Sequence, residues 1–287
     1  MQPDPEIAIV EDCMQVYREG GHDGLIGLGG GSAIDIAKSV GAYAGYHGAL
    51  EDLFGIDQVP RKGPPLIAIP TTAGTGSEVT NVAILSDRVA QLKKGIISDY
   101  LLPDVALVSP QMTLTCPPRV TAASGVDALA HAIEAYLSLN ASAITDSLAI
   151  GAIKLIVKAL PKAFANPAHL QAREDMATAS LMAGMAFGNA GVGAVHAMAY
   201  PLGGRFHMSH GQQCLAAALC HDLEQDGLRR AYAGYRRGHG GTDRAPERQR
   251  GGRPGSGGHG SVVCGGGNSQ RLAPVSYTHL RAHETGR

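Results

Sequence analysis

GVDALAHAIEAY, residues 125–136, is the stretch of this sequence on which its interpretation depends. Ala, Leu, Ile and Glu favour a helix, and neither Gly nor Pro occurs between Gly125 and Gly151. Asp127 and His131 are four residues apart, so their side chains leave the same helix face one turn apart. A carboxylate and an imidazole at this spacing can bind one metal ion. An aspartate that complements the dipole in the first helical turn would look the same.

A second segment, GAVHAMAYPLGG at 193–204 followed by HMSHG at 207–211, supplies further histidines. His196 lies among small apolar residues, where an imidazole without a partner would be costly to bury. His210 follows a segment that contains Gly and Pro, and it directly precedes Gly211. One carboxylate and three histidines form a ligand set suited to Fe²⁺ or Zn²⁺.

Together the two segments resemble the metal-binding core of the iron-containing (group III) alcohol dehydrogenases. The resemblance implies four metal ligands: Asp127, His131, His196 and His210. His207 competes for the last place, but the family pattern puts the ligand immediately before a glycine, which favours His210. Tyr200 stands where many members carry a proton-relaying histidine, and a phenol with a pKa of about 10 is a poorer base at neutral pH.

A glycine-rich turn near the start of the chain predicts a phosphate site. An apolar strand at 24–28 runs into GGGS at 29–32 and then into a helix at 33–44. This order points backbone N–H groups at phosphate, although tight strand–helix turns also use glycine for structural reasons. With Asp35 and Lys38, the spacing GGGSxxDxxK resembles the family's pyrophosphate-binding turn and differs from GxGxxG.

A second polar turn, PTTAGTGSEVT at 70–80, follows an apolar strand at 65–70. Its hydroxyls suit phosphate and ribose oxygens, while the structural alternative is that Thr75 or Ser77 caps a helix. Lys93 is either a cofactor contact or a solvated lysine beside Lys94. The resemblance implies NAD(H) or NADP(H) as cofactor, bound by Gly30, Gly31, Ser32, Asp35, Thr71, Thr72, Thr80 and Lys93.

The order of elements predicts an α/β part followed by an all-helical part, with a boundary near residue 110. Residues 1–110 form the dinucleotide-binding domain and residues 111–227 the metal-binding domain of a dehydroquinate synthase-like, iron-containing alcohol dehydrogenase fold. Helices are expected at 120–138, 143–165, 168–187 and 195–199, and Pro161 is expected to kink or end the second. Cofactor and metal would meet in the cleft between the two parts.

Both ends of the sequence depart from the family pattern. The resemblance covers about residues 3–227 and implies a preceding ribose-binding strand and helix that this chain lacks. Residues 228–287 carry 11 of the 24 basic residues but only 3 of the 25 acidic ones. An RNA-binding tail is one interpretation, but the Gly/Arg-rich composition favours a disordered, frame-shifted tail. We therefore expect weak folding and low turnover compared with a full-length relative.

The activity implied by the resemblance is hydride transfer between an alcohol and a nicotinamide cofactor, with the metal as Lewis acid. The alternatives are a zinc-dependent glycerol-dehydrogenase-like or dehydroquinate-synthase-like enzyme, and an inactive fragment. Five unpaired cysteines and no apolar run of membrane length predict a cytoplasmic protein without a membrane partner. The expected partner is a small alcohol or aldehyde; nucleic acid is disfavoured, and a homo-oligomer is allowed.

Overall fold

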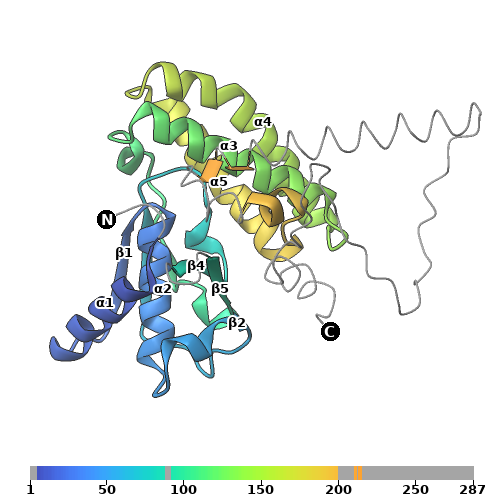
Figure 1. Ribbon diagram of the computed structural model, residues 1–287. Coiled ribbons are helices and arrows are strands. Elements are labelled where there is room, and N and C mark those ends of the chain that lie inside the picture. The colour runs from blue at the N-terminus through green and yellow to red at the C-terminus, as the bar shows by residue number, and fades with distance from the viewer. Residues whose placement is uncertain (1–4, 88–91, 200–209, 212, 215–287) are drawn as a thin grey trace, which may run out of the picture.

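The computed structural model describes residues 5–87, 92–199, 210–211 and 213–214. Figure 1 shows an α/β part followed along the chain by a part built of long helices, which confirms the predicted fold class. The predictions for Tyr200, His207 and the tail at 228–287 lie outside the described residues. None of the described helices combines the length and the apolar character that crossing a bilayer requires.

A small parallel sheet forms the centre of the α/β part. Its strands are β1 (Leu25–Gly29), β3 (Leu66–Pro70) and β6 (Val105–Ala106), in the order β1-β3-β6. Because β1 and β3 are parallel and pair in register from Leu25–Leu66 to Gly29–Pro70, their carboxyl ends meet at one edge. Both predicted polar turns begin at this edge. The third strand, β6, is only two residues long.

Helix α2 (Gly31–Ala44) starts directly after β1 and packs on one face of this sheet. A Cβ on Gly27 would lie 3.1 Å from Ala37 and 3.2 Å from Ile34, so helix and strand approach closely. The other face of the sheet is partly open. Four apolar side chains, each about half exposed or more, gather there: Ile26, Leu28, Val105 and Leu107.

A second sheet, which the sequence did not predict, lies beside α2. It contains β2 (Gly55–Ile56), β5 (Leu92–Ile97) and β4 (Val82–Asp87), with β4 and β5 antiparallel. Helix α1 (Ile7–Glu19) shares a core with this sheet. Short 3₁₀ turns complete the α/β part and the link to the helices: η1 (Leu50–Leu53), η2 (Ser77–Val79), η3 (Asp99–Leu101) and η4 (Pro110–Thr113).

The helical part consists of α3 (Pro118–Leu137), α4 (Ala143–Ala165) and α5 (Leu170–Ala190), followed by a short helix at 194–199. Its core is rich in fully buried alanines, which allow the helices to pack closely. Of the two outcomes expected at Pro161, a kink or an end, the end is excluded, since α4 continues to Ala165. Pro161 and Val157 are both exposed, so water can satisfy the carbonyl that loses its helical partner.

Glycines bring the two parts into contact at the second polar turn. A Cβ on Gly76 would lie 2.5 Å from the Cα atom of Gly184 in α5. A Cβ on Gly74 would lie 2.5 Å from Ser124 in α3. The turn after β3 is thus pressed against both α3 and α5. This contact fixes the carboxyl edge of the parallel sheet, where the polar turns begin, relative to α3, the helix that carries Asp127 and His131.

Candidate metal centre and cofactor turn

Three segments that are far apart in the sequence bring their polar side chains together. Asp127 comes from α3, His196 from the helix at 194–199, and His210 from the described residues near 210. The Oδ1 atom of Asp127 lies 3.6 Å from Nε2 of His196 and 3.4 Å from Nε2 of His210. Asp127 and His196 are buried. Three of the four predicted metal ligands therefore face one point.

Cys214 joins this group, although no role was predicted for it from the sequence. Its Sγ atom lies 3.6 Å from Oδ1 of Asp127 and 3.8 Å from Nε2 of both His196 and His210. One donor atom from each of these four residues falls within 4.8 Å of the others. The signal was available, because Cys214 follows His210 at the same four-residue spacing that links Asp127 to His131.

Glu134 is a second residue that the sequence reading missed. Its carboxylate pairs with Nδ1 of the His196 ring, and its Oε1 atom accepts a hydrogen bond of 2.7 Å from the backbone N–H of Val195. Glu134 lies two helical turns after Asp127 on α3, so one helix holds both a candidate ligand and the group that orients another. Carboxylates commonly orient metal-binding histidines in this way.

His131, the fourth predicted ligand, lies beside the group. Its ring stacks between Phe187, at a centroid distance of 4.1 Å, and His196, at 4.4 Å. Its Nδ1 atom lies 4.0 Å from Oδ2 of Asp127 and has no hydrogen-bond partner among the described residues. Burial lowers the pKa of His131 to about 3, so the ring is neutral at physiological pH.

The charges of the group are coupled. Burial alone would raise the pKa of Asp127, but the imidazoles of His131 and His210 and the hydrogen bond with His196 hold it well below its usual range. Burial would lower the pKa of His196, yet its contacts with Asp127, Cys214 and Glu134 raise it well above the ordinary value. Proton and metal would compete for this imidazole.

These residues fit a divalent transition metal. Carboxylate, imidazole and thiol are the donors that Fe²⁺ and Zn²⁺ accept. The buried Nδ1 atom of His131 has no partner among the described residues, as expected of a side chain whose surroundings include an ion. Asp127, His131 and His196 are each at least 95% buried, which no purely solvated surface cluster would be.

The two predicted cofactor turns meet at the carboxyl edge of the parallel sheet. The backbone N–H of Thr71 donates to the carbonyl of Gly29 at 2.8 Å, which ties the turns together. A Cβ on Gly30 would lie 3.4 Å from the side chain of Thr72. Gly31 and Ser32 open α2, where first-turn N–H groups lack partners within the helix. Gly30, Gly31, Ser32, Thr71 and Thr72 thus lie together at this edge, and their role as phosphate contacts stays a prediction.

Asp35 and Thr80 are also predicted to contact the cofactor, which stays a prediction, and both form hydrogen bonds with other protein groups. Asp35 accepts a 2.5 Å hydrogen bond from Ser77 and a 3.1 Å bond from the backbone N–H of Ile84. Thr80 offers its carbonyl to the ammonium group of Lys38 at 2.7 Å. Lys38 is 1% exposed and also donates to the carbonyl of Val82. The structure gives these residues a role inside the α/β part.

Lys93 lies on β5, opposite Ser86 of β4. It belongs to the second sheet and not to the carboxyl edge of β1 and β3. Its assignment as a cofactor contact stays a prediction. The structural alternative for Thr75 holds in part, because its Oγ1 atom accepts a hydrogen bond from the N–H of Ser77, the first residue of η2.

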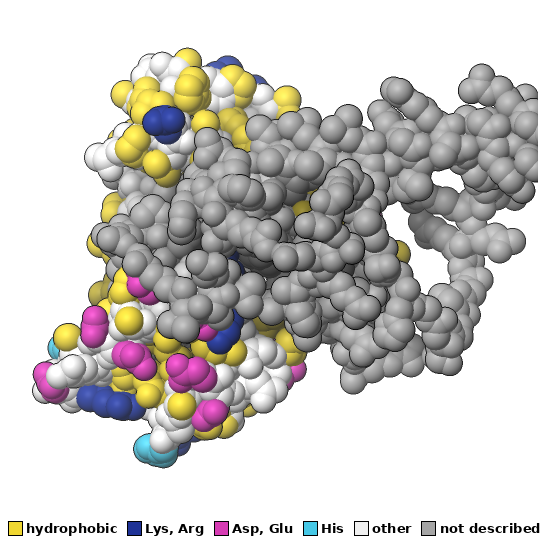
Figure 2. All heavy atoms as spheres, viewed as in Figure 1, with side chains coloured by type: hydrophobic (Ala, Val, Ile, Leu, Met, Phe, Trp, Pro, Cys, Tyr) yellow, Lys and Arg dark blue, Asp and Glu magenta, His cyan; other side chains and the backbone are white. Residues whose placement is uncertain are grey.

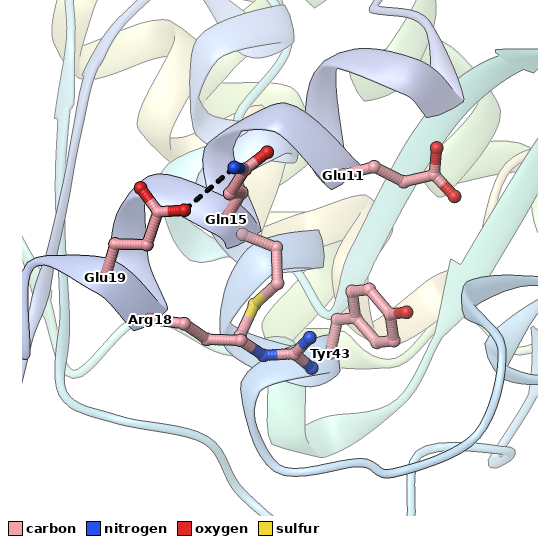
Figure 3. A pocket seen from close by; sticks show the side chains of 6 residues that line it. Glu11, Gln15, Arg18, Glu19 and Tyr43 are labelled. Carbon is pink, nitrogen blue, oxygen red and sulfur yellow. Dashed lines mark hydrogen bonds between the residues drawn. The ribbon is translucent and has the colours of Figure 1, made fainter.

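A surface hollow lies apart from both sites, between α1 and α2. Figure 3 shows that its walls include Glu11, Gln15, Arg18, Glu19 and Tyr43. The guanidinium of Arg18 lies 5.3 Å from the centre of the Tyr43 ring, and Gln15 donates to Glu19 at 2.8 Å. These groups satisfy one another. Figure 2 shows acidic and scattered basic side chains among hydrophobic ones on this face of the α/β part, so the described part of this face carries no basic patch.

Known proteins resemble this chain along most of its described length. The iron-containing alcohol dehydrogenase family model matches residues 1–110, and the model of the family's C-terminal part matches residues 121–230. Long-chain-alcohol dehydrogenase 1 of Geobacillus thermodenitrificans is 52% identical over 213 residues, which are 73% of this chain and 53% of that protein.

Solved structures agree with the sequence matches. A 1,3-propanediol oxidoreductase has a TM-score of 0.72 at 44% identity, over 74% of this chain and 56% of that one. The sulfoacetaldehyde reductase of Bifidobacterium kashiwanohense, solved with NAD⁺, has a TM-score of 0.71 at 39% identity, over 75% of this chain and 57% of that one. The chain spans a little over half the length of these relatives.

Proposed function

Because this chain belongs to the iron-containing alcohol dehydrogenase family, we propose that it carries the site for hydride transfer between a small alcohol, or its carbonyl counterpart, and NAD(H) or NADP(H). The observation that supports this most is the convergence of Asp127, His196 and His210 from three segments on one buried point. The family match favours this function over a zinc-dependent glycerol-dehydrogenase-like or dehydroquinate-synthase-like enzyme.

The proposed ligands of Fe²⁺, or of Zn²⁺ in its place, are Asp127, His131, His196 and His210. When bound, the ion supplies Lewis-acid polarisation of an alcohol or carbonyl oxygen. The protein contributes the arrangement of the donors. Glu134 accepts from Nδ1 of His196, fixes the tautomer of that ring and leaves Nε2 facing the centre. The stack of Phe187 on His131 restrains the second ring.

For the nicotinamide cofactor, which supplies the redox chemistry when bound, we propose Gly30, Gly31, Ser32, Thr71 and Thr72 as the pyrophosphate contacts. Small residues at this edge let the backbone approach the phosphates. Asp35, Lys38 and Thr80 hold this edge in place from inside. The three free cysteines among the described residues support a reducing, cytoplasmic setting. A homo-oligomer and the proton-relay role of Tyr200 stay predictions.

The test compares metal content and cofactor-linked turnover in matched variants. The protein is purified without oxygen, its Fe and Zn are counted, and NAD(H)- and NADP(H)-linked activity is measured on a panel of alcohols and aldehydes. We expect His196→Ala to lose most of the bound metal and all turnover, while His169→Ala, a helix-capping histidine outside the cluster, keeps both. We expect His207→Ala to keep its metal. Equal metal content in His196→Ala and the parent protein would refute the assignment.

A further inference from the structure

The thiol of Cys214 has two different sets of neighbours. The residue packs in an apolar cluster with Ala199, Val195 and Met198, as a buried structural cysteine would. Its sulfur, however, faces Asp127, His196 and His210 at 3.6–3.8 Å. A cysteine that served only as apolar filling would have no reason to direct sulfur at three candidate metal ligands.

The distances within this group match the edges of a coordination tetrahedron. With metal–nitrogen or –oxygen bonds of about 2.0–2.1 Å and a metal–sulfur bond of about 2.3 Å, the ligand atoms of a tetrahedral site lie about 3.3–3.6 Å apart. Five of the six separations among the donor atoms are 3.4–3.8 Å. The sixth, between the two imidazoles, is no longer than 4.8 Å. Small shifts would close the shell.

A second observation points to the same place. His131, 95% buried, directs an Nδ1 atom without a described partner toward Oδ2 of Asp127. The cluster therefore has an unsatisfied donor or acceptor on one side and a sulfur facing its centre on the other.

We propose that Cys214 is itself a ligand of the metal ion, so that this site contains a thiolate beside its carboxylate and imidazoles. The inference rests on the proposed metal site. A thiolate donor favours Zn²⁺ over Fe²⁺ compared with a shell of oxygen and nitrogen alone. With Asp127, His131, His196 and His210 it would make five candidate donors, one more than a tetrahedral site holds, so Cys214 and His131 would compete for the fourth place.

Cobalt substitution tests this directly, because thiolate-to-Co²⁺ charge transfer absorbs strongly in the near ultraviolet and carboxylate or imidazole ligands give no such band. The metal-free full chain is titrated with Co²⁺ under anaerobic conditions, and binding is followed separately by competition with a chelating dye. We expect one equivalent of Co²⁺ to produce the band in the parent protein. Cys214→Ala should bind Co²⁺ without the band and should lose roughly tenfold or more in Zn²⁺ affinity.

Cys116→Ser provides the matched control, because Cys116 is also buried and free, and among the described residues its thiol donates to the carbonyl of Pro117 and to no candidate metal ligand. It should keep the full band. X-ray absorption of the zinc-loaded parent protein should show one sulfur at about 2.3 Å, a measurement that needs no variant to fold. Tight Co²⁺ binding without the band would overturn the Cys214 proposal and leave the metal site intact. Failure of the parent protein to bind Co²⁺ or Zn²⁺ would overturn the proposed function as well.

Discussion

At the scale of single residues, the candidate metal centre depends on buried polar groups that have specific partners. Glu134 is 6% exposed and bridges His196 and the backbone of Val195, so it orients a ring without facing the centre itself. Burial would raise the pKa of Glu134, but the hydrogen bond with His196 lowers it overall, which keeps the carboxylate charged. A charged acceptor holds the imidazole more firmly than a neutral one.

Replacing Glu134 by Gln should therefore weaken metal binding by about 10- to 100-fold. The amide keeps the volume of the side chain but loses the charge that fixes the His196 tautomer. The measurement is Zn²⁺ affinity by chelator competition, together with the circular dichroism spectrum, which should not change. Glu174→Gln, an exposed change on α5, should keep the parent affinity. Equal affinities for the two variants would show that Glu134 is only a packing residue.

Lys38 links stability to pH. Burial lowers the pKa of Lys38 to about 8, although Asp35 and Glu78 oppose this. The unfolded chain then binds more protons than the folded one between about pH 8 and the ordinary lysine pKa, so the free energy of unfolding rises with pH in this range. We expect a rise of about 1 kcal/mol from pH 8 to pH 9. Urea unfolding at several pH values measures it.

Lys38→Met should be less stable at every pH, because the carbonyls of Thr80 and Val82 lose their donor. It should also lose the rise between pH 8 and pH 9. Lys154→Met, at an exposed lysine of α4, should keep that rise. The same rise in Lys38→Met as in the parent protein would assign the pH dependence to another group.

At the scale of elements, two glycines one turn apart on α5 have different surroundings. A Cβ on Gly184 would lie 2.8 Å from Val79 and 2.9 Å from the Cα atom of Gly76, which has φ +60° and no freedom to move away. A Cβ on Gly188 would make only ordinary contacts, the nearest at 3.5 Å from Thr80. Of the two, only Gly184 is needed for the close approach of α5 to the second polar turn, the one that follows β3.

We expect Gly184→Ala to destabilise the protein by about 1–3 kcal/mol through overpacking. Because Phe187 lies on the same helix and stacks on His131, displacement of α5 should also weaken metal binding. Gly188→Ala should be neutral, or stabilising by up to about 1 kcal/mol through helix propensity. Thermal unfolding and Zn²⁺ affinity report the two effects. The idea fails if Gly184→Ala is as stable as Gly188→Ala.

At the scale of the whole molecule, the two faces of the parallel sheet β1-β3-β6 differ in how far other elements bury them. Helix α2 packs on one face, whereas Ile26 is 67% exposed and Leu28 is 53% exposed on the other. Both lie on β1, an edge strand of the described sheet. Exposed apolar side chains on a sheet edge favour association between copies.

Ile26→Lys should therefore reduce self-association of the chain several-fold at unchanged concentration. Its unfolding free energy should change by no more than about 0.5 kcal/mol, because the side chain is mostly in solvent. Sedimentation velocity measures the associated fraction. Ile144→Lys, at a 75% exposed residue of α4, serves as the control and should leave that fraction unchanged. If the parent protein and Ile26→Lys associate equally, the sheet face that carries Ile26 and Leu28 is not the cause of self-association.

The sequence by itself determined the elements whose signals are local. The strands before both polar turns and the three long helices were predicted within a few residues, because apolar periodicity and Gly or Pro punctuation depend on neighbours in the chain. The second sheet was missed, since Lys93 and Lys94 interrupt the apolar pattern of β5 and its pairing with β4 is a tertiary property. The continuation of α4 past Pro161 is likewise a tertiary property, because it depends on the exposure of Val157 and Pro161 to water.

For the candidate site, the sequence supplied Asp127, His196 and His210, and the tertiary structure brought them together. Only the tertiary structure decided that Glu134 orients His196, that Cys214 directs its sulfur inward and that Asp35 and Thr80 serve an internal network. The physical reason is that spacing along a helix fixes which side chains share a face. What that face meets is set by the packing of segments from elsewhere in the chain, and this decides whether a buried polar group becomes a ligand, a support for a ligand or part of the core.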